Sequence, residues 1–170
     1  MDIKNRSIGA IACLFLAWWC APVHAGKLEL PDGSHLDLAA VCPVCNMKPT
    51  SNPLGPAAVV FKDGRVVGFD GARHLFIYVL DTKTHACDLN KVSGLFVTVY
   101  GTRDFIDARK AFFVMESDVK GNMGSEVVPF ATRETAEKFR TDHNGKRVAT
   151  FGEVTLDDVR EKKGKLKMHH

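Results

Sequence analysis

The chain has 170 residues, of which 45% are hydrophobic, and its formal net charge at pH 7 is +3. This length is enough for the core of one ordinary domain or of two very small ones. The nearly balanced charge argues against nucleic acid binding, and no apolar stretch beyond the first residues approaches the length that spans a membrane.

The N-terminal region has the layout of a secretory signal peptide. Lys4 and Arg6 give it a positive start, and residues 8–19 form an apolar run too short to cross a bilayer as a stable helix. The small residues that follow predict cleavage after Ala25. We therefore expect an exported protein whose residues 1–25 are removed. An uncleaved N-terminal anchor is the alternative.

A lipid anchor on Cys20 is not expected. Trp18 and Trp19 stand where a lipoprotein signal needs small residues. Cleavage after Ala25 would leave a nearly neutral chain with no second apolar segment of membrane length. The mature protein should therefore be soluble.

Three cysteines follow the cleavage site: Cys42, Cys45 and Cys87. An odd number does not suit a purely structural disulfide framework in an oxidising compartment, because at least one thiol stays free. Free thiols there indicate metal binding or redox chemistry. Cys87 alone could also be a small buried residue.

The most informative segment is 42–47, which reads Cys-Pro-Val-Cys-Asn-Met. Its two thiols and one thioether are soft donors, and such donors select Cu(I) over harder divalent ions. Four prolines keep residues 42–56 irregular and predict a loop, whereas a thioredoxin-like CxxC opens a helix. A disulfide between Cys42 and Cys45, with Met47 merely packing, is the alternative.

Residues 57–100 predict a ββαβ unit. Two apolar runs, 57–61 and 65–69, flank the turn sequence Lys-Asp-Gly and indicate a hairpin. Asp70 can cap the helix that follows. That helix carries one apolar stripe: Ala72, Leu75, Phe76, Val79 and Leu80. A β-rich strand over residues 95–100 completes the unit.

The second half repeats this order of elements. Strands are predicted over 110–115 and 126–130, followed by a helix that Thr132 caps and that bears Ala136 and Phe139. A strand over 147–154 closes the unit. We expect an α+β protein of two packed ββαβ units, with these segments: signal peptide 1–25, lead-in and Cys/Met loop 26–56, first unit 57–100, second unit 101–156, and charged tail 157–170.

These features resemble the NosL family, the copper-binding accessory proteins of nitrous oxide reductase maturation, from about residue 42 to residue 154. The resemblance rests on four segments: Cys45-x-Met47, Phe-Lys-Asp-Gly at 61–64, Gly-Phe-Asp at 68–70, and Gly-Asn-Met-Gly-Ser-Glu at 121–126 leading into Val-Pro-Phe at 128–130. It implies a pair of ββαβ units, a fold like that of organomercurial lyase, and delivery of Cu(I) in the periplasm. The chain departs from the family in lacking a lipoprotein signal and in having Cys42.

The candidate metal ligands are Cys42, Cys45, Met47 and Met123. Met123 lies between glycines in a loop with little apolar surface to pack it, which favours a ligand over a core residue. Met115 ends an apolar strand and is expected in the core. His74 lies off the helix stripe and is expected to face solvent. The terminal Met168-His169-His170 is expected to bind metals only adventitiously.

We expect a Cu(I) metallochaperone that transfers copper by ligand exchange to a cuproenzyme, most reasonably nitrous oxide reductase or its assembly complex. No acid–base pair or nucleophile–histidine signature indicates an enzyme. The alternatives are a thiol–disulfide oxidoreductase using Cys42 and Cys45, a distant carbon–mercury lyase, and a structural module with a scaffold disulfide. The oxidoreductase would need a thiolate of lowered pKa, and the intervening Pro-Val offers no charge to produce one.

Overall fold

The computed structural model describes residues 26–160, which form an α+β fold containing the two expected ββαβ units. Its strands are β1 (Lys27–Glu29), β2 (His35–Asp37), β3 (Ala57–Phe61), β4 (Val66–Phe69), β5 (Val92–Thr98), β6 (Phe105–Asp107), β7 (Phe112–Met115), β8 (Lys120–Gly121), β9 (Gly124–Ser125), β10 (Val128–Phe130) and β11 (Arg147–Thr150). Its α-helices are α1 (Ala72–Leu80), α2 (Thr82–His85), α3 (Arg133–Asp142) and α4 (Leu156–Val159).

The first unit is built on a four-stranded sheet in the order β4-β3-β5-β6, with all neighbours antiparallel. Every residue of β3 is buried, because both faces of the sheet are covered. Successive side chains of a strand point to opposite faces. Val59 accordingly packs in the core that contains α1, and Val60 packs with Leu36 of the β1–β2 hairpin.

Helix α1 lies between the two units, and its predicted apolar stripe is buried except for Leu80, which is partly buried. Leu75 and Val79 share a core with strands β3 and β5 of the first sheet. Phe76 also reaches the second unit, where its ring meets Phe113 of β7 edge-on at 4.8 Å between centroids. The two units therefore share one hydrophobic core.

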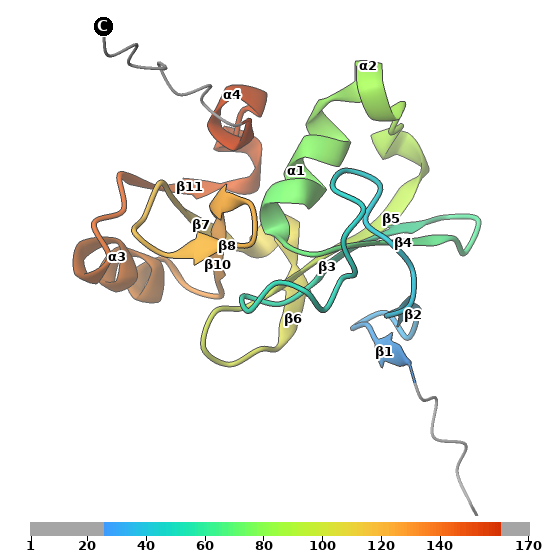
Figure 1. The fold of residues 1–170 in the computed structure, drawn as a ribbon, viewed down its shortest axis with the longest axis horizontal. Coiled ribbons are helices and arrows are strands. Elements are labelled where there is room, and N and C mark those ends of the chain that lie inside the picture. Colours follow the sequence, from blue (N-terminus) through green and yellow to red (C-terminus); the bar gives the residue numbers. More distant parts are fainter. Residues whose placement is uncertain (1–25, 161–170) are drawn as a thin grey trace, which may run out of the picture.

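The second unit has a three-stranded sheet in the order β10-β7-β11. Helix α3 covers its outer face, at the end of the molecule opposite the β1–β2 hairpin (Figure 1). Ala136 and Phe139 bury the helix against this sheet, as predicted. The predicted cap is confirmed, because the Thr132 hydroxyl accepts a hydrogen bond from the Thr135 amide at 3.2 Å.

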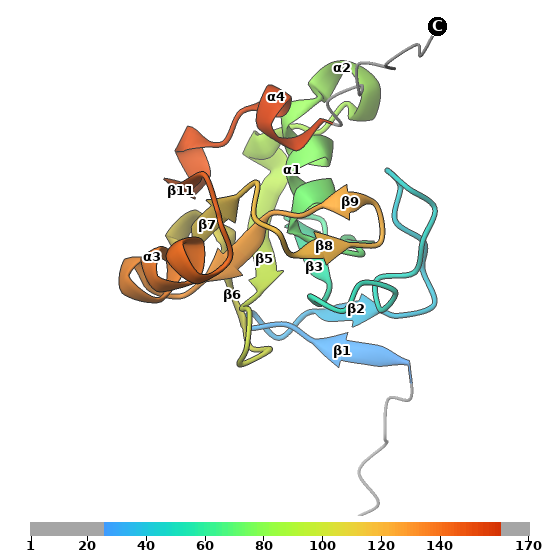
Figure 2. The ribbon, with the colours of Figure 1, turned by 60° about the vertical axis from the view of Figure 1, so that its left-hand side comes forward.

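Other segments differ from the predictions. Residues 27–37, expected as a polar lead-in, form the β1–β2 hairpin, which places buried Leu30 and Leu36 on the outer face of the first sheet. Strand β11 ends at Thr150. Residues 157–159, expected in the charged tail, belong to α4, which packs on α1 and buries Val159. Helix α4 lies close to α1 in Figure 2 as well.

The predicted signal peptide and the Met-His-His terminus lie outside the described residues. Within residues 26–160, no helix combines the length and apolar character needed to cross a membrane.

Candidate metal site

The segment 42–47 is a tight loop, as the prolines of residues 42–56 predict. The amide of Asn46 donates to the Cys42 carbonyl and the amide of Cys42 donates to the Met47 carbonyl, both at 2.8 Å. Asn46 has a φ of 60°, a left-handed conformation that asparagine tolerates better than most residues. These bonds close the loop so that Cys42 is fully buried while Cys45 stays partly exposed.

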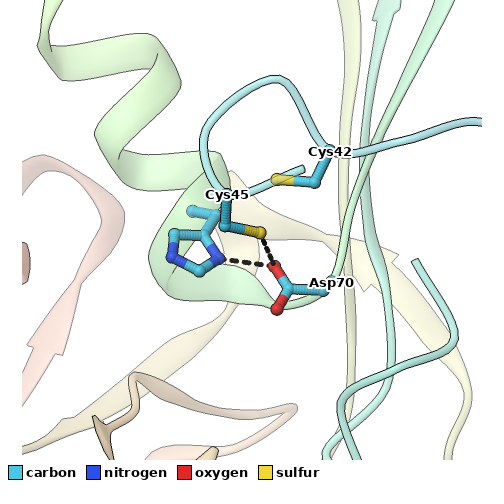
Figure 3. Close-up of side chains that lie close together, drawn as sticks. Cys42, Cys45 and Asp70 are labelled. Carbon is cyan, nitrogen blue, oxygen red and sulfur yellow. Dashed lines mark hydrogen bonds and ion pairs between the residues drawn. The ribbon is translucent and has the colours of Figure 1, made fainter. Parts of the chain in front are cut away.

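The loop brings both thiols to a carboxylate and an imidazole at the start of α1. Asp70 follows strand β4, and His74 lies one helical turn further on. Ligand atoms of Cys42, Cys45, Asp70 and His74 all lie within 4.8 Å of one another. Figure 3 shows the two cysteines above the Asp70 carboxylate, with one of its oxygens at the centre of the group.

A single carboxylate oxygen links the two halves of this cluster. Asp70 Oδ1 accepts a hydrogen bond from the Cys45 thiol at 3.3 Å and lies 2.5 Å from His74 Nδ1. Burial alone would raise the pKa of Asp70, but the contacts with His74 and Cys45 outweigh burial and lower it. Asp70 is therefore a carboxylate at neutral pH.

Cys45 is held as a neutral thiol. Burial raises its pKa to about 12, and the neighbouring Cys42 and Asp70 add to the increase, against a lowering by the Met47 backbone. Thiolates are the forms that bind metals, so a metal ion must displace this proton. The two thiols, the carboxylate and the imidazole are chemically able to hold one metal ion.

Two predictions for this region are wrong. His74 is buried, with 4% of its surface exposed, because it pairs with Asp70 instead of facing solvent. Asp70 does not cap α1, since its carboxylate is occupied by Cys45 and His74. The capping position is Gly71, which has no side chain to offer.

A glutamate from the second unit supplies the missing cap. One oxygen of buried Glu126 accepts from the backbone amide of Arg73 at 3.1 Å, and the other accepts from the Asn52 side chain at 2.8 Å. A negative charge at a helix N-terminus is favourable, although burial raises the pKa of Glu126. A Cβ at Gly71 would lie 2.7 Å from the Asn52 amide nitrogen. Because glycine has no Cβ, the Asn52 side chain can lie this close to the start of the helix.

The same contacts place the Met123 loop beside α1. Met123 lies at the turn of the β8–β9 hairpin, with 44% of its surface exposed, and Arg73 Nη1 donates to its carbonyl at 2.7 Å. Figure 2 shows this hairpin next to the N-terminal part of α1. Its approach to the helix that carries His74 is consistent with a ligand role, which stays a prediction.

The remaining sulfur residues are distributed as follows. Met47 is half-buried in the loop it shares with the cysteines, and its role as a ligand also stays a prediction. Met115 is buried in the core, as expected. Cys87 is a buried free thiol outside the four-residue cluster, and burial raises its pKa.

The sequence reasoning missed Asp70 and His74 as members of the site. A signal was present, since an aspartate and a histidine four residues apart at the start of a helix lie on one face. Linking that face to a cysteine loop 25 residues earlier requires the β3–β4 hairpin to fold back beside the loop.

Comparison with known proteins agrees with this architecture. No curated protein matches the sequence. The crystal structure of the copper chaperone NosL from Shewanella denitrificans is similar, with 29% sequence identity and a TM-score of 0.60 over 71% of this chain and 93% of that one. The sequence model of the NosL family matches residues 34–159. The chain belongs to the NosL family.

Proposed function

We propose that this protein is a periplasmic Cu(I) chaperone that delivers copper to a cuproenzyme, with nitrous oxide reductase as the recipient. The observation that supports this most directly is the convergence of the Cys42 and Cys45 thiols in one partly exposed loop. Soft sulfur donors favour Cu(I). The similarity to a copper chaperone of Shewanella denitrificans points the same way.

The geometry suits transfer by ligand exchange. Cys42 is fully buried and would anchor the cargo, while partly exposed Cys45 leaves one side open to a donor atom of the recipient. When copper leaves, Cys45 regains its proton and its hydrogen bond to Asp70. That bond stabilises the empty site and so lowers the free-energy cost of releasing copper.

The competing function is a thiol–disulfide oxidoreductase acting through Cys42 and Cys45. Such an enzyme needs a nucleophilic thiolate at neutral pH, which requires a lowered cysteine pKa. The pKa of Cys45 is instead raised to about 12, chiefly by burial. This favours a site whose thiol ionises only when a metal replaces the proton.

Anaerobic titration of the reduced protein against a Cu(I) chelator tests the proposal. We expect one Cu(I) per chain, with Cu–S scattering in X-ray absorption spectra. Asp70 and His74 are donors that also suit Zn²⁺, so Zn²⁺ is the appropriate competitor. The copper proposal fails if Zn²⁺ at equal concentration displaces Cu(I), or if no Cu–S scattering appears.

Binding of Cu(I) should release the Cys45 proton. Since the pKa of this thiol is about 12, it is protonated throughout the neutral range, and each binding event must remove that proton. The apparent affinity should then rise about tenfold per pH unit for this proton alone. Calorimetry in buffers of different ionisation enthalpy measures the release, and Cys45→Ser should release one proton fewer. A pH-independent affinity at neutral pH would contradict this.

Met123 is the proposed ligand from the second unit. Met123→Leu should weaken Cu(I) binding by about tenfold or more, since even changes around the ligands of metal sites have effects of this size. The melting temperature should stay unchanged, because the side chain is exposed and Arg73 holds only the backbone carbonyl. Met115→Leu, in the core, is the matched control. Equal affinity and an unchanged absorption spectrum for Met123→Leu would confine the site to the first unit.

We also propose that the protein is exported with cleavage after Ala25. The protein isolated from its native host should begin at Gly26 and carry no lipid, which intact-mass spectrometry measures. A diacylglyceryl mass on Cys20 or an intact Met1 would refute this proposal.

A further inference from the structure

A cavity of about 290 Å³ lies between the β8–β9 hairpin and the end of α4. Arg73, Met123, Ser125 and Arg160 are among the residues that line it, together with the carboxylates of Glu116 and Asp158. Its size is near the lower end of the range for small-molecule sites. None of these residues belongs to the Cys/Asp/His cluster.

Arg73 is the unusual group in this cavity. Only 6% of its surface is exposed, yet among residues 26–160 its guanidinium has no ion-pair partner, since the Glu126 carboxylate bonds the Arg73 backbone amide. Its Nε donates to the Val159 carbonyl at 2.8 Å and its Nη1 to the Met123 carbonyl at 2.7 Å. Within the described part of the chain, Nη2 makes no hydrogen bond. Buried arginines are normally paired, so this guanidinium is unusual in having an unused donor and no ion pair of its own.

The other charges around the cavity are balanced. Glu116 pairs with Lys146 and Asp158 pairs with Arg147 at 2.7 Å. Arg160 pairs with Asp81 at 2.9 Å. Among the charged residues that line the cavity, Arg73 is therefore the one without an ion pair, and it borders a space large enough for a ligand.

We propose that this cavity binds a singly charged organic carboxylate on Arg73, with Arg160 as a second contact. A guanidinium presents two parallel N–H donors that match a carboxylate. Because Arg73 is the one lining charge without an ion pair, a single negative charge would match it, whereas the second charge of a phosphate would lack a partner. The Met123 side chain adds an apolar wall suited to the carbon chain of an acid.

The carboxylate could come from a free organic acid or from an aspartate or glutamate of a partner protein. Either source would present the same group to Arg73. The occupant would lie against the hairpin that carries Met123, but its binding needs no metal. Failure of this proposal would therefore leave the copper proposal unaffected.

NMR titration of the metal-free protein tests the site. With propionate, we expect saturable shifts of the Met123, Gly124 and Ser125 amides, and a weaker response to inorganic phosphate. A blocked peptide with a single glutamate is the second arm. Tighter binding of the peptide than of propionate identifies a protein carboxylate as the source, and the reverse identifies a free acid.

Four variants make the test specific. Arg73→Lys keeps the charge but loses the paired donors and should bind propionate about tenfold more weakly. Arg73→Gln should abolish binding. Arg160→Gln alters an exposed side chain, so it should fold normally and still weaken binding severalfold. Arg103→Gln, at an exposed arginine that does not line the cavity, should bind as wild type does.

Three results would overturn the proposal. The first is the absence of saturable shifts with either carboxylate. The second is unchanged binding in Arg160→Gln together with unchanged binding in either Arg73 variant. The third is tighter binding of phosphate than of propionate.

Discussion

Replacing Cys45 with serine should lower the affinity for Cu(I) by at least about a hundredfold, because the loss of a ligand exceeds the effect of changes around one. The fold should survive the substitution. A serine hydroxyl has nearly the size of the thiol and can donate the same hydrogen bond to Asp70. We therefore expect the melting temperature to change little. Chelator competition and thermal unfolding of the same preparation measure the two effects.

Cys87→Ser is the matched control for this experiment. It also removes one thiol, but from a buried position outside the four-residue cluster. Its Cu(I) affinity should equal that of the wild type, whatever its effect on stability. If Cys87→Ser weakens copper binding as much as Cys45→Ser does, the loop is not the binding site.

The regular elements were predictable because their signals are local. The strand at 57–61 is a continuous apolar run next to a turn sequence, and the structure has β3 at these residues. The helix stripe of Leu75, Phe76 and Val79 predicted which face of α1 is buried. In each case the signal lies within the element itself, so no distant contact was needed to predict it.

The cysteine loop was also predictable, but its partners were not. The prolines of residues 42–56 predict an irregular segment, and the sulfur donors of residues 42–47 predict a metal site there, from composition alone. The burial of His74 was not predictable in this way, since a histidine off an apolar stripe is usually solvated. Its burial depends on Asp70 and on the loop that packs over both. That arrangement is a property of the tertiary fold.

Elements stabilised by distant contacts were missed for the same reason. The β1–β2 hairpin has mostly exposed strand residues, and buried Leu36 acquires its role only against the outer face of the first sheet. Glu126 is predicted as the first residue of a strand, yet it precedes β10 and caps α1 across the boundary between the units. Both units therefore contribute to one core and to the surroundings of one site.

Phe76→Ala should be the most destabilising of the substitutions discussed here. The side chain is fully buried, and its ring lies 4.8 Å from that of Phe113 and 5.2 Å from that of Phe151. Removing a buried phenylalanine side chain costs about 3–5 kcal/mol in the free energy of unfolding. The cost for Phe76→Ala should be near the upper end of this range. Its helix belongs to the first unit and its ring packs on the second, so the substitution weakens the contact between the two units. Denaturant unfolding followed by circular dichroism measures the cost.

Leu89→Ala is the control, since this leucine is 47% exposed and its loss should change stability by no more than about 0.5 kcal/mol. The shared core also predicts that both units unfold in one transition, in the wild type and in Phe76→Ala alike. Two separate transitions in the wild type would show that the units fold independently. A cost below about 1 kcal/mol for Phe76→Ala would show that this ring does not join them.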